Sequence, residues 1–311
     1  HGPAWANSLF EDNAEHGYGM YLGQKAIRNR LIDEVKAILD KDAPETLKAA
    51  AKAYLDTVDD GKTNAPATKA LVAELEKVAG SCEHCAEILK YKEYLSKKSV
   101  WIFGGDGWAY DIGFGGVDHV LASGEDVNIM VFDTEVYSNT GGQASKASQI
   151  GQVAQFAAAG KTVAKKSLAE IAMSYGYIYV AQIAMGADIN QTLKALKEAE
   201  AYHGPSLVIG YAPCEMHSIK GGMIHCQDEM RKAVACGYWN MFRFNPANAK
   251  PFTIDSKAPT TDYKEFIMNE ARYSSLTRSF PERAEELFNK AAENAKEKRA
   301  HLEKLQALYN D

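Results

Sequence analysis

Two stretches of sequence decide the fold, VWIFGGDGWAY at residues 100–110 and VNIMVFDTEVYSNTGG at residues 127–142. Each begins with an apolar run that lacks polar alternation, which is typical of a strand buried on both faces of a parallel sheet. Each run then ends in a polar loop. Because ligands of open α/β sheets bind beside the carboxyl ends of the strands, we expect the two loops to form one site.

The chemistry of these loops indicates what the site holds. Asp106 offers a carboxylate, and the loop that begins at Thr134 offers a hydroxyl and bare carbonyl groups. Such an all-oxygen set suits Mg²⁺ held together with a diphosphate. Residues 108–122 are expected to be helical, with free amide groups at their amino-terminal end that favour phosphate oxygens. A lone Gly-Asp-Gly also makes ordinary turns, so the prediction depends on both loops.

The spacing, order and residue types of the two loops resemble the thiamine diphosphate motif, in which a second metal-binding loop follows Gly-Asp-Gly. More narrowly, four stretches resemble pyruvate:ferredoxin oxidoreductase, namely residues 2–12, 101–113, 136–143 and 255–259. The resemblance covers nearly all of the chain except roughly residues 35–97. It implies the carboxyl-terminal, thiamine-binding portion of a large multidomain enzyme, and the His at position 1 suggests a fragment.

The resemblance also implies an architecture. We expect one thiamine diphosphate-binding α/β domain over residues 1–311, with a doubly wound, mostly parallel sheet. A helical insertion is expected at about residues 35–97 and a carboxyl-terminal extension, ending in a helix, at about residues 246–311.

The activity implied by the resemblance is the oxidative decarboxylation of pyruvate. Thiamine diphosphate and Mg²⁺ would serve the decarboxylation, and coenzyme A would take the acetyl group. Electrons would leave through [4Fe–4S] clusters to ferredoxin or flavodoxin. The remaining domains of the same enzyme and a second copy of it, in a homodimer, are the expected partners. Two alternatives stay open: an oxidoreductase for another 2-oxo acid, and a non-catalytic module that binds the cofactor without turnover.

Roles for individual residues follow from the resemblance. The carboxylate of Asp106, the hydroxyl of Thr134 and the backbone carbonyl of Val136 are expected to bind Mg²⁺. Thr134 stands where many thiamine enzymes carry Asn, a departure that this family shares. The residues expected to let the backbone approach the diphosphate are Gly105, Gly107 and Trp108. Asn139 is expected to face the substrate or the diphosphate. Asn7 and Phe10 are expected to face the active site, although Phe10 is nearly as well explained as an ordinary core aromatic.

Cys214 directly follows an apolar run at residues 207–211, which places it at the ligand edge of the sheet. The resemblance matches it to the last of four cysteines that hold the [4Fe–4S] cluster nearest the thiamine. The other three ligands are expected upstream of His1. A competing interpretation is a zinc site, because Cys and His at these spacings are competent zinc ligands; it would use Cys214, His217, His225 and Cys226.

The other cysteines have simpler interpretations. Cys82 and Cys85 form a Cys-x-x-Cys that, by spacing alone, is half of a metal site or a redox pair. No second pair stands at ligand spacing, so free thiols are the default expectation. Cys236 lies in an apolar pattern and is expected to be a core residue.

Composition limits the remaining classes of function. A chain of 311 residues that is 46% hydrophobic can bury one large core or two small ones. The net charge is −6, and no basic stripe offers a surface for nucleic acid. The longest apolar runs are strand-length, so no membrane span is expected. We expect a cytoplasmic protein, with any targeting segment lying upstream.

Helix and strand patterns alternate after residue 98, as in a parallel α/β sheet. Strands are expected at 177–183 and 206–211, helices at 168–175 and 190–202, and a final helix from about Ser279. In the amino-terminal third, a helix at 27–39 is assigned to the sheet domain by the resemblance. Apolar residues at helical spacing predict two further helices, with the break between them at residues 61–66.

Overall fold

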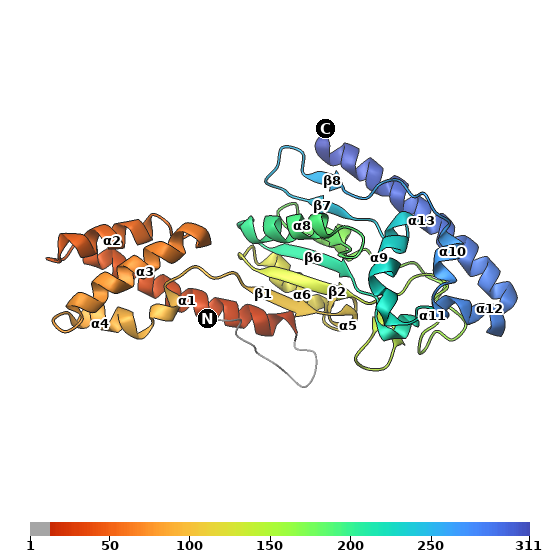
Figure 1. The fold of residues 1–311 in the computed structure, drawn as a ribbon, viewed down its shortest axis with the longest axis horizontal. Helices are drawn as coiled ribbons and strands as arrows, with labels where there is room; N and C mark the ends of the chain where they lie inside the picture. The colour runs from red at the N-terminus through yellow and green to blue at the C-terminus, as the bar shows by residue number, and fades with distance from the viewer. Residues whose placement is uncertain (1–12) are drawn as a thin grey trace. The chain divides into compact units, whose positions relative to one another are not determined.

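The structure is a computed structural model that describes residues 13–311. The chain forms two compact units, one of residues 17–100 and one that contains residues 101–311 (Figure 1). Asn7 and Phe10, which the sequence suggested as substrate-facing residues, lie outside the described residues.

Within the described residues, the larger unit is built on a six-stranded sheet of order β1-β2-β6-β5-β7-β8. The first four strands in this order run parallel, and β7 and β8 add an antiparallel edge. A separate two-stranded hairpin, β3–β4, follows β2. The strands are β1 (Trp101–Gly104), β2 (Asn128–Asp133), β3 (Val136–Tyr137), β4 (Gln143–Ala144), β5 (Tyr179–Ile183), β6 (Ser206–Tyr211), β7 (Phe242–Phe244) and β8 (Phe252–Ile254).

The parallel strands form where the sequence has uninterrupted apolar runs. Every residue of β6 is buried, and β2 is buried except at Phe132. Met130, Tyr179 and Val208 from three neighbouring strands pack in one cluster with alanines of the helix α8. This burial confirms the predicted fold class, a mostly parallel α/β sheet with covering helices.

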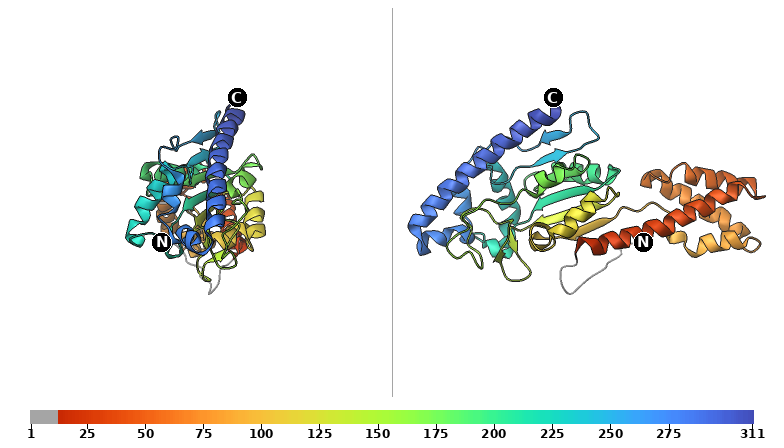
Figure 2. Two further views of the ribbon diagram at one scale, coloured as in Figure 1. Left: turned by 90° about the vertical axis from the view of Figure 1, so that its right-hand side faces the viewer. Right: turned by 180° about the vertical axis from the view of Figure 1, so that it is seen from behind.

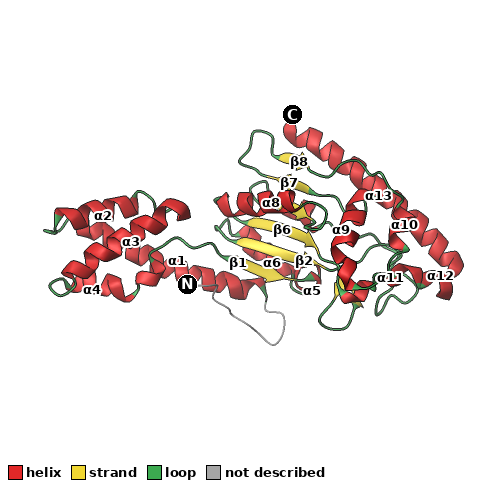
Figure 3. Cartoon of the chain, in the orientation of Figure 1, coloured by secondary structure: helices red, strands yellow, loops and turns green. Residues whose placement is uncertain are grey.

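Helices connect the strands of this unit (Figure 3). They are α5 (Asp106–Tyr110), α6 (Phe114–Ala122), α7 (Leu168–Met173), α8 (Ile189–Ala201), α9 (Cys226–Ala235), α10 (Tyr263–Ile267), α11 (Ala271–Ser274), α12 (Leu276–Ser279) and α13 (Pro281–Asn310). Three short 3₁₀ helices, η1 (Lys92–Tyr94), η2 (Glu215–His217) and η3 (Met223–His225), complete the described set in the two units.

The prediction of one helix over residues 108–122 was wrong, because the structure has two helices there, α5 and α6, with a turn between them. The side chain of Asp111 leaves the helical path and accepts the backbone N–H of Lys146 at 2.9 Å. Gly113 allows the chain to turn back, since a Cβ there would lie 2.4 Å from the carbonyl oxygen of Trp108.

In the carboxyl-terminal part, the sequence predicted the long helix α13 but not the short strands β7 and β8. The helix α13 packs against β8 and α12 (Figure 2). It buries Leu287, Ala291 and Leu302. Its last turn brings the ring of Tyr309 within 4.9 Å of the ring of Phe244 in the short strand β7. No helix among residues 13–311 is long and apolar enough to cross a membrane.

Residues 17–100 form a unit of helices only, and this unit begins earlier in the chain than the helical insertion expected at about residues 35–97. Its α-helices are α1 (Ala14–Leu39), α2 (Glu45–Leu55), α3 (Gly61–Val78) and α4 (Glu83–Lys90). Placing residues 27–39 with the sheet was wrong. Leu31, Val35 and Ile38 of α1 instead pack with α2, α3 and α4, because the apolar face of α1 continues into this separate core.

The break between α2 and α3 also differs from the expectation. Residues 61–66 are the first turns of α3, and the break lies at residues 56–60. Asp60 ends the break as the helix cap, because its side chain accepts the backbone N–H of Lys62 at 2.9 Å. Pro66 lies in the second turn of α3, where a proline cannot donate a backbone hydrogen bond to the preceding turn.

Candidate metal and diphosphate site

The loops after β1 and β2 meet at the carboxyl edge of the sheet through Asp106. This residue begins α5, and only 2% of its surface is exposed. Its carboxylate accepts the backbone N–H of Thr134 at 3.0 Å and that of Glu135 at 3.1 Å. The hydroxyl of Thr134 also donates to Oδ2 of Asp106. The structure therefore brings together the two loops that the sequence paired.

The hydroxyl of Thr134 lies between two further oxygen atoms. It is 3.1 Å from the carbonyl oxygen of Val136 and 2.7 Å from the hydroxyl of Ser138. Neighbouring ligands of an octahedral Mg²⁺ ion lie about 3 Å apart, since each is about 2.1 Å from the metal. The hydroxyl of Thr134 thus lies at this spacing from the carbonyl of Val136 and also contacts the carboxylate of Asp106, and these three oxygens are of the kinds that Mg²⁺ binds.

A second buried carboxylate, Asp133, lies beneath the first. It accepts hydrogen bonds from the hydroxyl of Tyr110 at 2.6 Å and from Nζ of Lys165 at 2.7 Å. Burial, together with the nearby charge of Asp133, raises the pKa of Asp106 well above its ordinary value. The carboxylate of Asp133 is already paired with Lys165 and Tyr110. Asp106 is therefore the carboxylate that remains for a ligand beside Thr134 and Val136.

Glu135 is the residue that sequence reasoning missed. It is fully buried and has a φ of +62°, a conformation that non-glycine residues rarely adopt. Its carboxylate lies 2.9 Å from Arg272, accepts Nε2 of Gln149 at 3.2 Å and accepts the hydroxyl of Tyr238. Burial acts to raise the pKa of Glu135, but the nearby charges of Arg272, Lys165 and His217 together outweigh burial and hold this pKa below its ordinary value.

His217 supports the same loop from the other side. Its Nε2 donates to the carbonyl oxygen of Thr134 at 2.8 Å, and its Nδ1 lies 3.6 Å from Glu270. Glu270 in turn accepts Nε of Arg272 at 2.6 Å. We call His217, Glu270, Arg272 and Glu135 the loop-supporting network, since it contacts residues 134 and 135 without adding an oxygen to the metal position.

The residues expected near the diphosphate have distinct surroundings. Gly105 caps α5, and Gly107 is required because a Cβ there would lie 2.1 Å from the ring of Tyr137. The ring of Trp108 is buried, so only its backbone remains for a ligand at this edge. Asn139 is exposed on the loop between β3 and β4.

Cys214 follows β6 and is half-buried, with its Sγ 3.4 Å from the hydroxyl of Ser138. It therefore lies beside the loop that carries Thr134. The zinc alternative has no support, because residues 13–311 contain no group of three His, Cys, Asp or Glu side chains that could hold a metal ion. The ring of His217 is turned instead to the carbonyl of Thr134.

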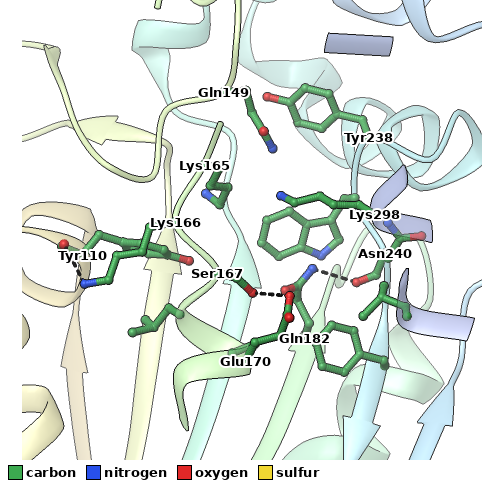
Figure 4. Close-up of a pocket in the computed structure, with 15 residues that line it drawn as sticks. Tyr110, Gln149, Lys165, Lys166, Ser167, Glu170, Gln182, Tyr238, Asn240 and Lys298 are labelled. Carbon is green, nitrogen blue, oxygen red and sulfur yellow. Dashed lines mark hydrogen bonds between the residues drawn. The ribbon is translucent and has the colours of Figure 1, made fainter. Parts of the chain in front are cut away.

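A small cavity of about 50 Å³ lies behind the loops, between the sheet and α13. Figure 4 shows Gln149, Lys165 and Lys298 extending toward one another across this space. Lys298 has no hydrogen-bond or ion-pair partner within the described part of the chain. Burial, with the nearby charge of Lys165, lowers the pKa of Lys298 to about 8.

Comparison with known proteins defines the class. Residues 86–209 match the family described as "Thiamine pyrophosphate enzyme, C-terminal TPP binding domain". This range contains both loops of the site. Over this range the chain is therefore similar to the thiamine diphosphate-binding domain of this enzyme family.

The particular relatives are oxidoreductases. The chain is 51% identical over 98% of its length to pyruvate:ferredoxin oxidoreductase of Moorella thermoacetica, and it spans 27% of that protein. It is 49% identical, also over 98% of its length, to pyruvate-flavodoxin oxidoreductase of Klebsiella pneumoniae, of which it spans 26%. The chain thus corresponds to about a quarter of these enzymes, which confirms the resemblance seen in the motifs.

Among solved structures, 2-oxoglutarate:ferredoxin oxidoreductase from Magnetococcus marinus matches over 37% of this chain and 40% of that chain. The TM-score is 0.35 at 24% identity.

Proposed function

We propose that the chain is the thiamine diphosphate- and Mg²⁺-binding portion of an enzyme that oxidises pyruvate to acetyl-CoA and CO₂. The enzyme passes the electrons through [4Fe–4S] clusters to ferredoxin or flavodoxin. The observation that carries the proposal is the grouping of the oxygens of Asp106, Thr134 and Val136 between the two loops. Its chemical meaning comes from relatives about 50% identical that are named for pyruvate.

In this proposal the chain's own residues hold the metal and orient the diphosphate. Asp106 supplies a negative charge, and Thr134 and Val136 supply neutral oxygens to Mg²⁺. The charge of Glu135 is already balanced by Arg272, so it keeps the loop in place and does not bind the ion. Bound thiamine supplies an acceptor for the electrons that are released when CO₂ leaves the substrate. Asn139, exposed at the edge of the site, faces the substrate or the diphosphate.

Cys214 contributes one thiolate to a [4Fe–4S] cluster. Such clusters are usually held by four thiolates, and the described residues bring no further metal-binding group to Cys214. The other three ligands therefore come from outside residues 1–311. We expect this chain alone to form no stable cluster when it is incubated with iron and sulfide.

The rest of the enzyme completes the active site. The carboxylate that activates the aminopyrimidine ring of thiamine belongs to another domain, and the working form is a cytoplasmic homodimer that also binds coenzyme A. The two loops described here hold only the diphosphate end of the cofactor. The chain alone should therefore bind the cofactor without oxidising pyruvate.

The test is a dye-reduction assay with pyruvate, coenzyme A, thiamine diphosphate, Mg²⁺ and a viologen. The complete protein should reduce the dye, and neither residues 1–311 alone nor the complete protein with Asp106→Ala should do so. Parallel assays with 2-oxoglutarate and indolepyruvate test the substrate class. Faster turnover of either acid than of pyruvate would replace the proposed substrate, and full activity of the chain alone would refute the division between domains.

A further inference from the structure

Cys82 and Cys85 lie in the helical unit and are not used by the proposed function. Cys82 is the cap residue of α4, and its Sγ accepts the backbone N–H of Cys85 at 3.2 Å. Both sulfur atoms therefore belong to the first turn of one helix. The spacing of three residues places the two side chains on the same face, where a short movement joins them.

The two thiols have different access to solvent. Cys82 is half-buried at the end of the helix, whereas Cys85 is 2% exposed and packs among Leu47, Leu75 and other residues of the helical core. Burial, together with the hydrogen bond to Cys82, raises the pKa of Cys85 to about 12. The sulfur of Cys82 is therefore the one that a dissolved disulfide reaches first. The outer sulfur is thus suited to attack and the inner one to stay protonated until it reacts.

The neighbouring His84 does not complete a metal site with these thiols. Its Nδ1 is 2.7 Å from the carboxylate of Glu34, and its Nε2 is 2.9 Å from the carbonyl oxygen of the same residue. Both ring nitrogens are therefore occupied. Residues 13–311 also offer no third His, Cys, Asp or Glu placed to hold a metal with the pair.

We propose that Cys82 and Cys85 are a redox-active dithiol that converts reversibly to an intrachain disulfide by exchange with a small-molecule disulfide. The thiolate of Cys82 attacks the disulfide, forms a mixed disulfide and releases one small thiolate. Cys85 then gives up its proton, attacks the sulfur of Cys82 and displaces the second thiolate. The two protein thiols are oxidised, and one small disulfide is reduced to two thiols.

Counting free thiols tests the pair. The full chain is equilibrated with excess oxidised glutathione, unfolded, and alkylated, and the labels are counted by mass spectrometry with peptide mapping. The reduced chain should carry five labels, one for each cysteine. The oxidised chain should lose the labels of Cys82 and Cys85 together, and dithiothreitol should restore them. Persistence of both labels, or a link from either residue to another cysteine, would overturn the proposal.

Single variants test the order of attack. Cys85→Ala should stop at one glutathione adduct on Cys82, because no resolving thiol remains. Cys82→Ser retains a capping hydroxyl and should fold, yet Cys85 should gain no adduct. Cys226→Ser, a control outside the helical unit, should form the Cys82–Cys85 disulfide as the unmodified chain does. If Cys85 reacts equally well without Cys82, the assigned roles are wrong.

Discussion

At the scale of single residues, the loop that carries Thr134 is held by side chains from distant parts of the sequence. His217 is 83 residues from Thr134, and Tyr238 is 103 residues from Glu135. Partners of metal ligands that do not touch the metal commonly change its affinity by about 10- to 100-fold, because they orient the ligands. The loop-supporting network is placed to act in this way, since it holds both the carbonyl of Thr134 and the side chain of Glu135.

We predict that His217→Ala raises the Mg²⁺ concentration needed for half-maximal binding of thiamine diphosphate by about 10-fold or more. The variant removes the hydrogen bond to the carbonyl of Thr134 and leaves that oxygen without its buried donor. His217→Gln should recover most of the affinity, because an amide can donate in place of Nε2. Calorimetry measures the Mg²⁺ concentration at which thiamine diphosphate binding reaches half of its maximum. Equal affinities of the Ala and Gln variants, with unchanged melting temperatures, would contradict the role of His217.

The loop-supporting network is a part of the site that could not be predicted from the sequence. The two loops could be paired in advance because each follows a recognisable buried strand, whereas the roles of Asp106, Thr134 and Val136 came from the resemblance. Glu135 stood in the same motif, but no local pattern shows that a charged residue at that position turns inward. Its partners Arg272 and Tyr238 come from the carboxyl-terminal third, and only the folded chain brings them together.

At the scale of elements, long apolar runs were predicted more reliably than short ones. The strands β5 and β6 appear where expected, within two residues at their ends. β7 and β8 contain only three residues each, so they are too short for a periodic pattern. The break between α5 and α6 was missed because it depends on a distant contact between Asp111 and Lys146.

The helical unit supplies a prediction about element packing. Arg28 of α1 donates to the carbonyl oxygen of Leu95 at 3.0 Å and to that of Val58 at 2.8 Å, which ties α1 to the ends of other segments. Arg28→Met should lower the free energy of unfolding of this unit by about 3 kcal/mol, since the hydrogen bonds of a charged group to two carbonyl oxygens and to Oδ1 of Asn64 are lost. Urea unfolding with hydrogen exchange at the amides of α1–α4 measures the loss.

Arg30→Met is the matched control for Arg28. The side chain of Arg30 is 48% exposed and lies 3.9 Å from Glu87, so its replacement should cost less than about 1 kcal/mol. Both variants of the full chain should bind thiamine diphosphate as the unmodified chain does, because the site lies in residues 101–311. If the two variants are equally stable, Arg28 does not tie the helices together as described.

At the scale of the whole molecule, two partly buried lysines make stability depend on pH. Burial lowers the pKa values of Lys298 and Lys161 to about 8, whereas unfolded lysine has a pKa of about 10.4. Between these values the unfolded chain binds more protons than the folded chain. The free energy of unfolding should therefore rise from about pH 8 to pH 10. Above that range the buried tyrosines oppose the trend, because burial raises the pKa of Tyr110 and of Tyr211.

Lys298→Met should isolate this effect. The variant should be more stable than the unmodified chain at pH 7, and its advantage should shrink by about 2 kcal/mol by pH 10. Lys296→Met, at an exposed position of the same helix, serves as the control and should leave the pH profile unchanged. The measurement is urea unfolding at several pH values. If the free energy of unfolding depends on pH in the same way in Lys298→Met and in the unmodified chain, the charge on Lys298 does not destabilise the folded state.

The central claim is that Asp106, Thr134 and Val136 hold the Mg²⁺ ion that binds the diphosphate of thiamine. Calorimetric titration of thiamine diphosphate into the purified chain, with Mg²⁺ or with a chelator, tests it most directly. We predict heat of binding only with Mg²⁺, loss of affinity by more than about 100-fold in Asp106→Asn and Thr134→Val, and retention in Thr134→Ser. Asp228→Asn, an exposed carboxylate on α9, should bind as the unmodified chain does. Equal binding with the chelator, or unchanged affinity in Asp106→Asn, would contradict the account.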